Sequence, residues 1–130
     1  MKHINVLIIE DSFYSADLNV RELRKAGFVV QHKIVGSRRA MQEALKDRQW
    51  DIILSDNNMP GFDALQAIEV RNSSGLQTPF AIVSEDMPEK DVRRAVKAGC
   101  FAYISKEHLS MLGQHVKSIL GEDSLKAEEK

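Results

Sequence analysis

The chain has 130 residues, of which 43% are hydrophobic and 28% are charged, and its formal net charge is -1 at pH 7. This length favours one domain, and the composition is typical of a soluble globular protein. The nearly balanced charge argues against direct nucleic-acid binding, and no apolar run approaches the ~20 residues that span a bilayer. The single cysteine, Cys100, cannot form an internal disulfide, so we expect a buried structural thiol and a cytoplasmic protein with no membrane insertion.

Five short apolar runs alternate with segments of helical spacing. The runs are rich in Ile and Val and mostly lack polar alternation, as expected for strands buried on both faces. Strict alternation of strands and helices predicts a parallel sheet with helices on both of its faces. We therefore predict an α/β fold of the flavodoxin-like type, a three-layer (βα)5 sandwich with strand order 2-1-3-4-5. In chain order, the predicted strands are Ile4–Ile9, Phe28–Val35, Asp51–Ser55, Pro79–Val83 and Phe101–Ile104.

The segments between the strands carry apolar residues at the spacing of one helix face. Ser37 and Asp63 are suited to N-cap the second and third helices, and Pro88 suits the first turn of the fourth. Gly27 and Gly99 close the first and fourth helices, where a positive φ is favoured. The predicted apolar faces consist of Phe13, Ala16, Val20 and Leu23; of Ala40, Met41, Ala44 and Leu45; of Ala64, Leu65 and Ile68; of Val92, Ala95, Val96 and Gly99; and of Leu109, Leu112, Val116, Ile119 and Leu120.

No internal repeat or low-complexity linker interrupts this pattern, so we predict one domain over residues 1–121. The residues after Gly121 are polar. We predict that residues 122–130 form a solvated tail, or a helix that continues toward a further domain.

Acidic residues and one lysine follow the predicted strand ends. Glu10 and Asp11 follow the first strand, Asp56 the third and Lys106 the fifth. In the predicted strand order, the ends of strands 1 and 3 line the active crevice. Three carboxylates repel one another unless a cation joins them, so the pattern predicts a divalent metal with a phosphate nearby. Asp11 or Ser12 can also simply cap the first helix.

Five short motifs occur in order along the chain, each in or directly after one of the predicted strands. They read Ile-Glu-Asp-Ser at 9–12, Ser-Asp-Asn-Asn-Met-Pro-Gly at 55–61, Val-Ser at 83–84, and Ala-Tyr-Ile-Ser-Lys at 102–106, the last supplying both an aromatic residue and a lysine. One such motif is weak, but the ordered set is specific. Over residues 3–120 the chain resembles the receiver domain of two-component response regulators.

The resemblance implies that Asp56 accepts a phosphoryl group, with Mg²⁺ as the cofactor, from a histidine kinase or histidine phosphotransfer protein. It assigns the metal to the carboxylates of Asp11 and Asp56, to a water held by Glu10, and to the backbone carbonyl of Asn58. Lys106 would pair with a phosphoryl oxygen. Such a domain catalyses only its own phosphorylation and dephosphorylation, so we do not expect an enzyme with a separate substrate.

The resemblance also implies a switch. The Ser84 hydroxyl would donate to the phosphoryl group only after phosphorylation, and its movement would open space that Tyr103 can fill. This would reshape the face of the fourth helix, fifth strand and fifth helix, which a downstream effector or output domain would bind. Tyr103 also fits a plain core role, and Ser84 can cap the following loop. Lys90, Arg93, Arg94 and Lys97 of the fourth helix form either a solvated face or a docking stripe for an acidic partner.

Three residues depart from the family's pattern. Glu107 stands where a proline after a cis bond is usual, Asn57 where an apolar residue is usual, and Glu85 where a small one is usual. They motivate an alternative, a pseudo-receiver that binds partners through the same face without phosphorylation. A metal-dependent phosphohydrolase is a third reading. It needs a second catalytic aspartate two residues after the first, where Asn58 cannot transfer a proton.

Overall fold

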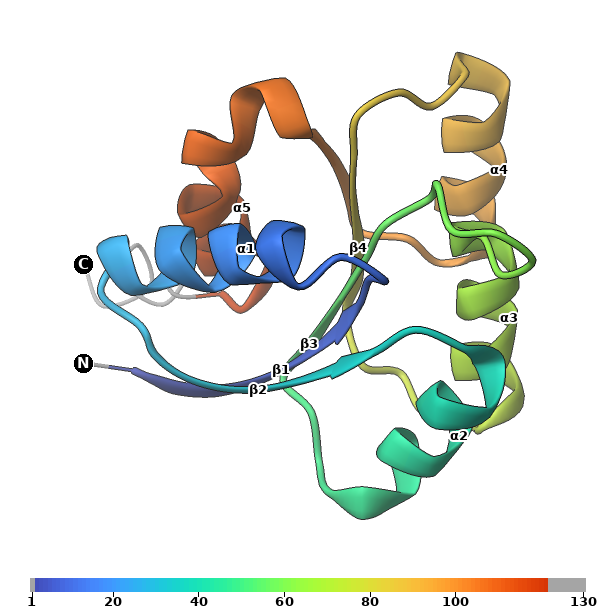
Figure 1. The fold of residues 1–130 in the computed structure, drawn as a ribbon, viewed down its shortest axis with the longest axis horizontal. Coiled ribbons are helices and arrows are strands. Elements are labelled where there is room, and N and C mark those ends of the chain that lie inside the picture. The colour runs from blue at the N-terminus through green and yellow to red at the C-terminus, as the bar shows by residue number, and fades with distance from the viewer. Residues whose placement is uncertain (1, 122–130) are drawn as a thin grey trace.

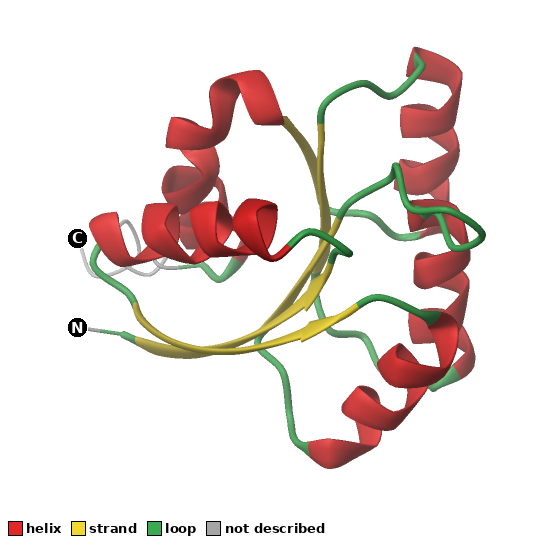
Figure 2. Ribbon diagram, viewed as in Figure 1, coloured by secondary structure: helices red, strands yellow, loops and turns green. Residues whose placement is uncertain are grey.

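The structure is a computed structural model that describes residues 2–121 (Figure 1). Its centre is a five-stranded, all-parallel sheet in the order β2-β1-β3-β4-β5, with helices on both faces (Figures 1 and 2). This confirms the predicted flavodoxin-like three-layer fold and its strand order. The predicted polar tail at 122–130 lies outside the described residues. Within them, no helix has both the length and the apolar character needed to span a bilayer.

Strands and helices alternate along the chain, and each strand end differs from its predicted position by at most one residue. The strands are β1 His3–Ile9, β2 Val29–Val35, β3 Ile52–Ser55, β4 Phe80–Ser84 and β5 Ala102–Ser105. The helices are α1 Phe13–Lys25, α2 Arg38–Asp47, α3 Ala64–Ser73, α4 Glu89–Ala98, the 3₁₀ helix η1 Lys106–Met111, and α5 Leu112–Ile119.

Two apolar cores form because each central strand buries both faces. Along β1, Ile4, Val6 and Ile8 pack in the core beneath α1 and α5, whereas Leu7 and Ile9 pack in the core beneath α2, α3 and α4. Figure 1 shows the same division, with α1 and α5 on one side of the sheet and the other three helices opposite. Strands β2 and β5 form the sheet edges and are partly exposed, so full burial holds only for the central strands.

The helix starts follow the predicted caps. Ser37 and Asp63 accept backbone N–H bonds at the starts of α2 and α3, and Asp63 forms a capping box with Gln66. Ser12 is the N-cap of α1, so this cap does not use the carboxylate of Asp11. Pro88 occupies the N-cap position of α4 rather than its first turn.

Two residues that we predicted on buried helix faces are exposed, so the prediction is wrong for them. Phe13 is 78% exposed, and Val96 is 56% exposed. Phe13 is the first residue of α1 and lies almost one turn before Ala16, the first residue that the helix buries. Helix α4 buries only Ala95, and the helix that it contacts is α3, so Val96 stays on its exposed side.

The chain after β5 also differs from the predicted single helix. It first forms η1, in which His108 has non-helical angles, and only then α5. The peptide bond between Lys106 and Glu107 is trans, as are all those in the described residues. The predicted apolar face is nevertheless present, because Leu112 and Val116 are buried in the core shared with α1.

Helix α5 approaches α1 closely at Gly113, which is buried. A β-carbon at this position would overlap the Cβ atom of Ala26 and lie 3.3 Å from the carbonyl oxygen of Glu22. The absence of a side chain therefore fixes the spacing of the two helices.

Replacing Gly113 with Ala should lower the free energy of unfolding by ~1–3 kcal/mol, because the added methyl group overpacks this contact. In a helix interior alanine is ~1 kcal/mol more favourable than glycine. A net loss of stability would therefore have to come from the steric overlap with α1. Urea unfolding followed by circular dichroism measures the change. The exposed Gln114→Ala is the control, and a Gly113→Ala protein as stable as wild type would contradict the contact.

Candidate functional site

The parallel register brings two acidic residues side by side at the carboxyl edge of the sheet. Ile9 of β1 pairs with Ser55 of β3, so Glu10 and Asp56 are the first residues beyond two adjacent strands. The N–H of Asp56 donates to the carbonyl of Ile9 at 2.9 Å, and the N–H of Glu10 donates to the carbonyl of Val35 at 2.9 Å. The sheet hydrogen bonds therefore continue into the site and hold both backbones.

Three carboxylates converge at this edge. Glu10, Asp11 and Asp56 each offer an oxygen, and these oxygens lie within 4.8 Å of one another. Glu10 is 4% exposed and Asp56 is 5% exposed, whereas Asp11 faces solvent. The convergence predicted from the strand ends is therefore present.

One lysine lies between the two buried acids. Lys106 Nζ is 3.3 Å from Glu10 Oε2 and 3.5 Å from Asp56 Oδ1. The other oxygen of Glu10, Oε1, accepts a hydrogen bond from the backbone N–H of Ser12 at 3.2 Å. The single ammonium group of Lys106 is thus shared by Glu10, 96 positions before it, and Asp56, 50 positions before it. One positive charge cannot balance three carboxylates.

The electrostatics indicate that this site carries more negative charge than its own residues can balance. Burial raises the pKa of Glu10, and the neighbouring charge of Asp56 raises it further, against smaller opposing effects of Lys106 and the Ser12 N–H. Asp56 Oδ1 is buried and has no hydrogen-bond partner among the described residues. Buried polar atoms are normally paired, so an unpartnered carboxylate oxygen beside two more carboxylates fits a divalent cation with oxygen ligands.

The loop after Asp56 is anchored to α3. Asn57 Oδ1 accepts the N–H of Ala64, the first residue of α3, at 3.3 Å. Met59 and Phe62 are buried in the core beneath the same helix. The departure at Asn57 is therefore explained by an added helix-cap bond, a role that we did not predict.

Ser84, the last residue of β4, is bonded through both its side chain and its backbone. Its hydroxyl is fully buried and accepts a hydrogen bond from Asn58 Nδ2 at 3.2 Å. Its carbonyl accepts a bond from the Tyr103 hydroxyl at 3.4 Å. The predicted switch residues therefore meet, and the side chain of Asn58 joins them, although the sequence suggested only its backbone carbonyl.

The Tyr103 ring is partly buried and packs against the core beneath α4, together with Met87 and Ala98. Burial raises the pKa of its phenol, and the negative charges of Asp86 and Glu107 act in the same direction. Tyr103 therefore contacts both the core and the end of β4 in this structure.

Tyr103→Phe should reduce the loss of stability at alkaline pH. Because the folded protein raises the phenol pKa above 10, this group contributes stability below pH 10 that is lost as the pH rises through the folded-state pKa. Urea unfolding above pH 10, with tyrosinate absorbance of the native protein, measures both effects. Tyr14→Phe is the control because Tyr14 is 74% exposed, and equal pH profiles for wild type and Tyr103→Phe would contradict the assignment.

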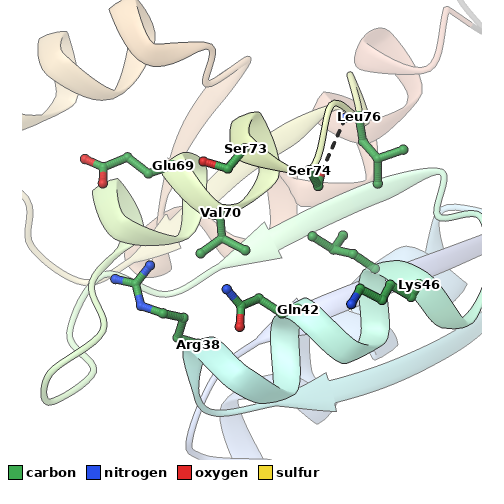
Figure 3. Close-up of a pocket in the computed structure, with 9 residues that line it drawn as sticks. Arg38, Gln42, Lys46, Glu69, Val70, Ser73, Ser74 and Leu76 are labelled. Atoms are coloured by element: carbon green, nitrogen blue, oxygen red, sulfur yellow. Dashed lines mark hydrogen bonds between the residues drawn. The ribbon is translucent and has the colours of Figure 1, made fainter.

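A groove of about 560 Å³ lies between α2 and α3 (Figure 3). Leu45 and Val70 supply its apolar part, and Arg38 and Lys46 supply cations from α2. The guanidinium of Arg38 also lies 5.3 Å from the ring centre of Phe62. None of the acidic strand-end residues lines this groove, so its volume does not mark the chemical site.

Comparisons with known proteins agree with this geometry. Residues 6–117 match the family model described as response regulator receiver domain. The hybrid signal transduction histidine kinase G of Dictyostelium discoideum is 26% identical over 109 residues, a match that covers 81% of this chain but only 3% of that protein.

Solved structures show the same fold. The receiver domain of the putative response regulator NarL from Mycobacterium tuberculosis is 25% identical, with a TM-score of 0.75 and coverage of 92% of this chain and 95% of that one. The receiver domain of a sensor histidine kinase from Pseudomonas aeruginosa, which has a magnesium ion coordinated in its active-site cleft, is 20% identical. Its TM-score is 0.74, and the match covers 92% of this chain and 98% of that one.

Proposed function

The chain belongs to the response regulator receiver domain family, and on that premise we propose that it accepts a phosphoryl group on Asp56. The observation that carries the proposal is the buried Oδ1 of Asp56, which accepts no hydrogen bond among the described residues and lies 3.5 Å from the Lys106 ammonium. A carboxylate oxygen would form a bond to phosphorus while the bond from phosphorus to the donor breaks and its electron pair leaves with the donor. The product is an acyl phosphate on Asp56.

The acidic cluster would hold Mg²⁺ through the carboxylates of Asp11 and Asp56 and the backbone carbonyl of Asn58, while Glu10 holds a water. When bound, Mg²⁺ supplies positive charge that offsets the charge of the phosphoryl oxygens. The convergence of the three acids supports this site, and so does the magnesium ion in the Pseudomonas receiver domain. The exposed position of Asp11 gives an ion access to the two buried acids.

Lys106 and Ser84 would then bind the transferred group. The ammonium of Lys106 would pair with a phosphoryl oxygen, since it already lies between Glu10 and Asp56. The hydroxyl of Ser84 would donate a hydrogen bond to another oxygen. Both residues stand at the same carboxyl edge, because Ser84 pairs with Ser105 at the ends of β4 and β5.

The phosphoryl donor would be a histidine kinase or a histidine phosphotransfer protein. The match to a hybrid histidine kinase supports this class of partner. Phe13 and Tyr14 also support it, because these two exposed aromatic side chains follow Asp11 at the start of α1, beside the acidic edge. Aromatic residues that remain exposed near a reactive site are typical of a docking surface.

The face formed by α4, β5 and α5 would bind the downstream effector or output domain. Ala95 is the only buried residue of α4, so this helix is held by few apolar contacts. Tyr103 connects the face to the site through its bond to the Ser84 carbonyl. The outer side of α4 also carries four exposed cations, Lys90, Arg93, Arg94 and Lys97, which suit an acidic partner.

Incubation with Mg²⁺ and a small phosphodonor should add the mass of one phosphoryl group to the wild-type protein, and Asp56→Asn should abolish the gain. Chelation of Mg²⁺ should also prevent it. Asp11→Asn removes a proposed direct ligand, so it should raise the Mg²⁺ concentration needed by roughly 10-fold or more, at least as much as the loss of an outer-shell partner. Intact-protein mass spectrometry measures the product. Asp17→Asn is the control, because Asp17 lies on the surface of α1 and pairs with Arg21.

A mass gain that survives Asp56→Asn would contradict the assignment of the acceptor. A wild-type protein that never gains mass, but binds a partner equally with and without Mg²⁺ and phosphodonor, would instead support the pseudo-receiver. A phosphorylated histidine phosphotransfer domain provides a second donor in the same assay. Phe13→Ala should slow transfer from this protein donor and leave the small phosphodonor unaffected.

Binding of Mg²⁺ with beryllofluoride, a phosphoryl mimic, should change amide hydrogen exchange over residues 86–111, because this segment contains α4 and β5. The central strand β1 is the internal reference and should exchange at the same rate in both states. Hydrogen-exchange mass spectrometry makes the measurement. Changes confined to residues 9–12 and 55–61 would show that the mimic binds without altering the proposed output face.

A further inference from the structure

We infer that the Asn58 carboxamide is a latch, which holds the Ser84 hydroxyl before phosphorylation and thereby sets how readily the site responds to a phosphoryl group. This inference rests on the proposed function, because it concerns the response of Ser84 to a group on Asp56. Asn58 acts through Ser84, so it is a positioning residue.

The hydrogen bond joins the loop after Asp56 to the end of β4. Asn58 Nδ2 donates to Ser84 Oγ at 3.2 Å across a separation of 26 residues. Ser84 is 0% exposed, so water does not compete for its hydroxyl oxygen. Within residues 2–121, Asn58 supplies the one hydrogen bond that this oxygen makes.

The hydroxyl does not donate to Oδ1 of the acceptor while it holds this contact. Asp56 Oδ1 forms an ion pair with Lys106 but accepts no hydrogen bond among the described residues, although Ser84 lies at the same sheet edge. A serine side chain moves between discrete staggered rotamers, so turning its oxygen toward Asp56 moves it off the Asn58 amide. Contact with a phosphoryl group and contact with Asn58 therefore compete.

The hydrogen bond from Asn58 is strong enough to adjust the response of Ser84 to a phosphoryl group, but too weak to prevent it. Asn58 is exposed, and a hydrogen bond between neutral groups contributes only modestly to stability, so its loss should change an equilibrium by roughly two- to tenfold. The bond from Tyr103 goes to the Ser84 carbonyl and not to its hydroxyl. Release of the latch can therefore reorient the side chain while the backbone stays connected to β5.

A double-mutant cycle on Asn58 and Ser84 tests the latch, with isothermal titration calorimetry of beryllofluoride in the presence of Mg²⁺. Asn58→Ala should bind the mimic roughly two- to tenfold more tightly than wild type, because no bond to Asn58 has to be broken. In a Ser84→Ala background, Asn58→Ala should leave the affinity unchanged. Asn57→Ala is the matched control, since its carboxamide bonds to Ala64 and its effect should be the same with either residue at position 84.

Weaker or unchanged binding by Asn58→Ala, or an equal effect in both backgrounds, would overturn the latch while leaving the proposed function intact. Failure of the wild-type protein to bind the mimic would overturn both. If circular dichroism shows that Ser84→Ala does not fold, NMR of the wild-type protein decides. The side-chain amide resonances of Asn58 should shift when the mimic binds, and unchanged resonances would overturn the inference.

Discussion

The crowding of carboxylates at one edge of a parallel sheet is the constraint on which the rest of the site depends. The register of β1 with β3 places Glu10 and Asp56 beside each other, and the hydrogen bonds of the sheet prevent them from separating. Burial itself raises the pKa of Glu10, and the neighbouring charge of Asp56 raises it further. A protein selected for stability alone would place apolar or neutral groups here. The arrangement is consistent with the proposed binding of a cation where the charges converge.

The architecture could be predicted because buried parallel strands leave an unambiguous pattern. Runs such as Ile4–Ile9 and Ile52–Ser55 are mostly apolar on both faces. The helices between the strands could be predicted from the spacing of their apolar residues and from their N-cap residues. Once the strand order follows, the positions of Glu10, Asp56 and Lys106 relative to one another follow as well, because each residue comes directly after a strand. Long-range convergence was therefore easier to predict than many local details.

Contacts that depend on side-chain rotamers and on loop paths could not be predicted in this way. The bonds of Asn57 to Ala64 and of Asn58 to Ser84 arise from the course of the loop after β3, which periodicity does not describe. Exposure of Phe13 and Val96 has a different cause, because the spacing of apolar residues specifies a face but not how far the neighbouring element extends over it. The break between η1 and α5 likewise preserves the predicted face while changing the backbone.

A switch of this kind requires one region that is rigid and another that is not. The backbones of Glu10 and Asp56 are held by the central sheet, so a new charge at the site cannot be relieved by moving the strands. Helix α4 buries only Ala95, so under the proposed function it is the element that a local change would shift most easily. A few hydrogen bonds to one phosphoryl group can shift the equilibrium between two conformations only by the difference in their strength between those conformations. They would therefore be effective only on an element that is weakly held. In the proposed switch Ser84 would be the connection, since its hydroxyl and carbonyl bond to Asn58 on the acceptor loop and to Tyr103 in β5.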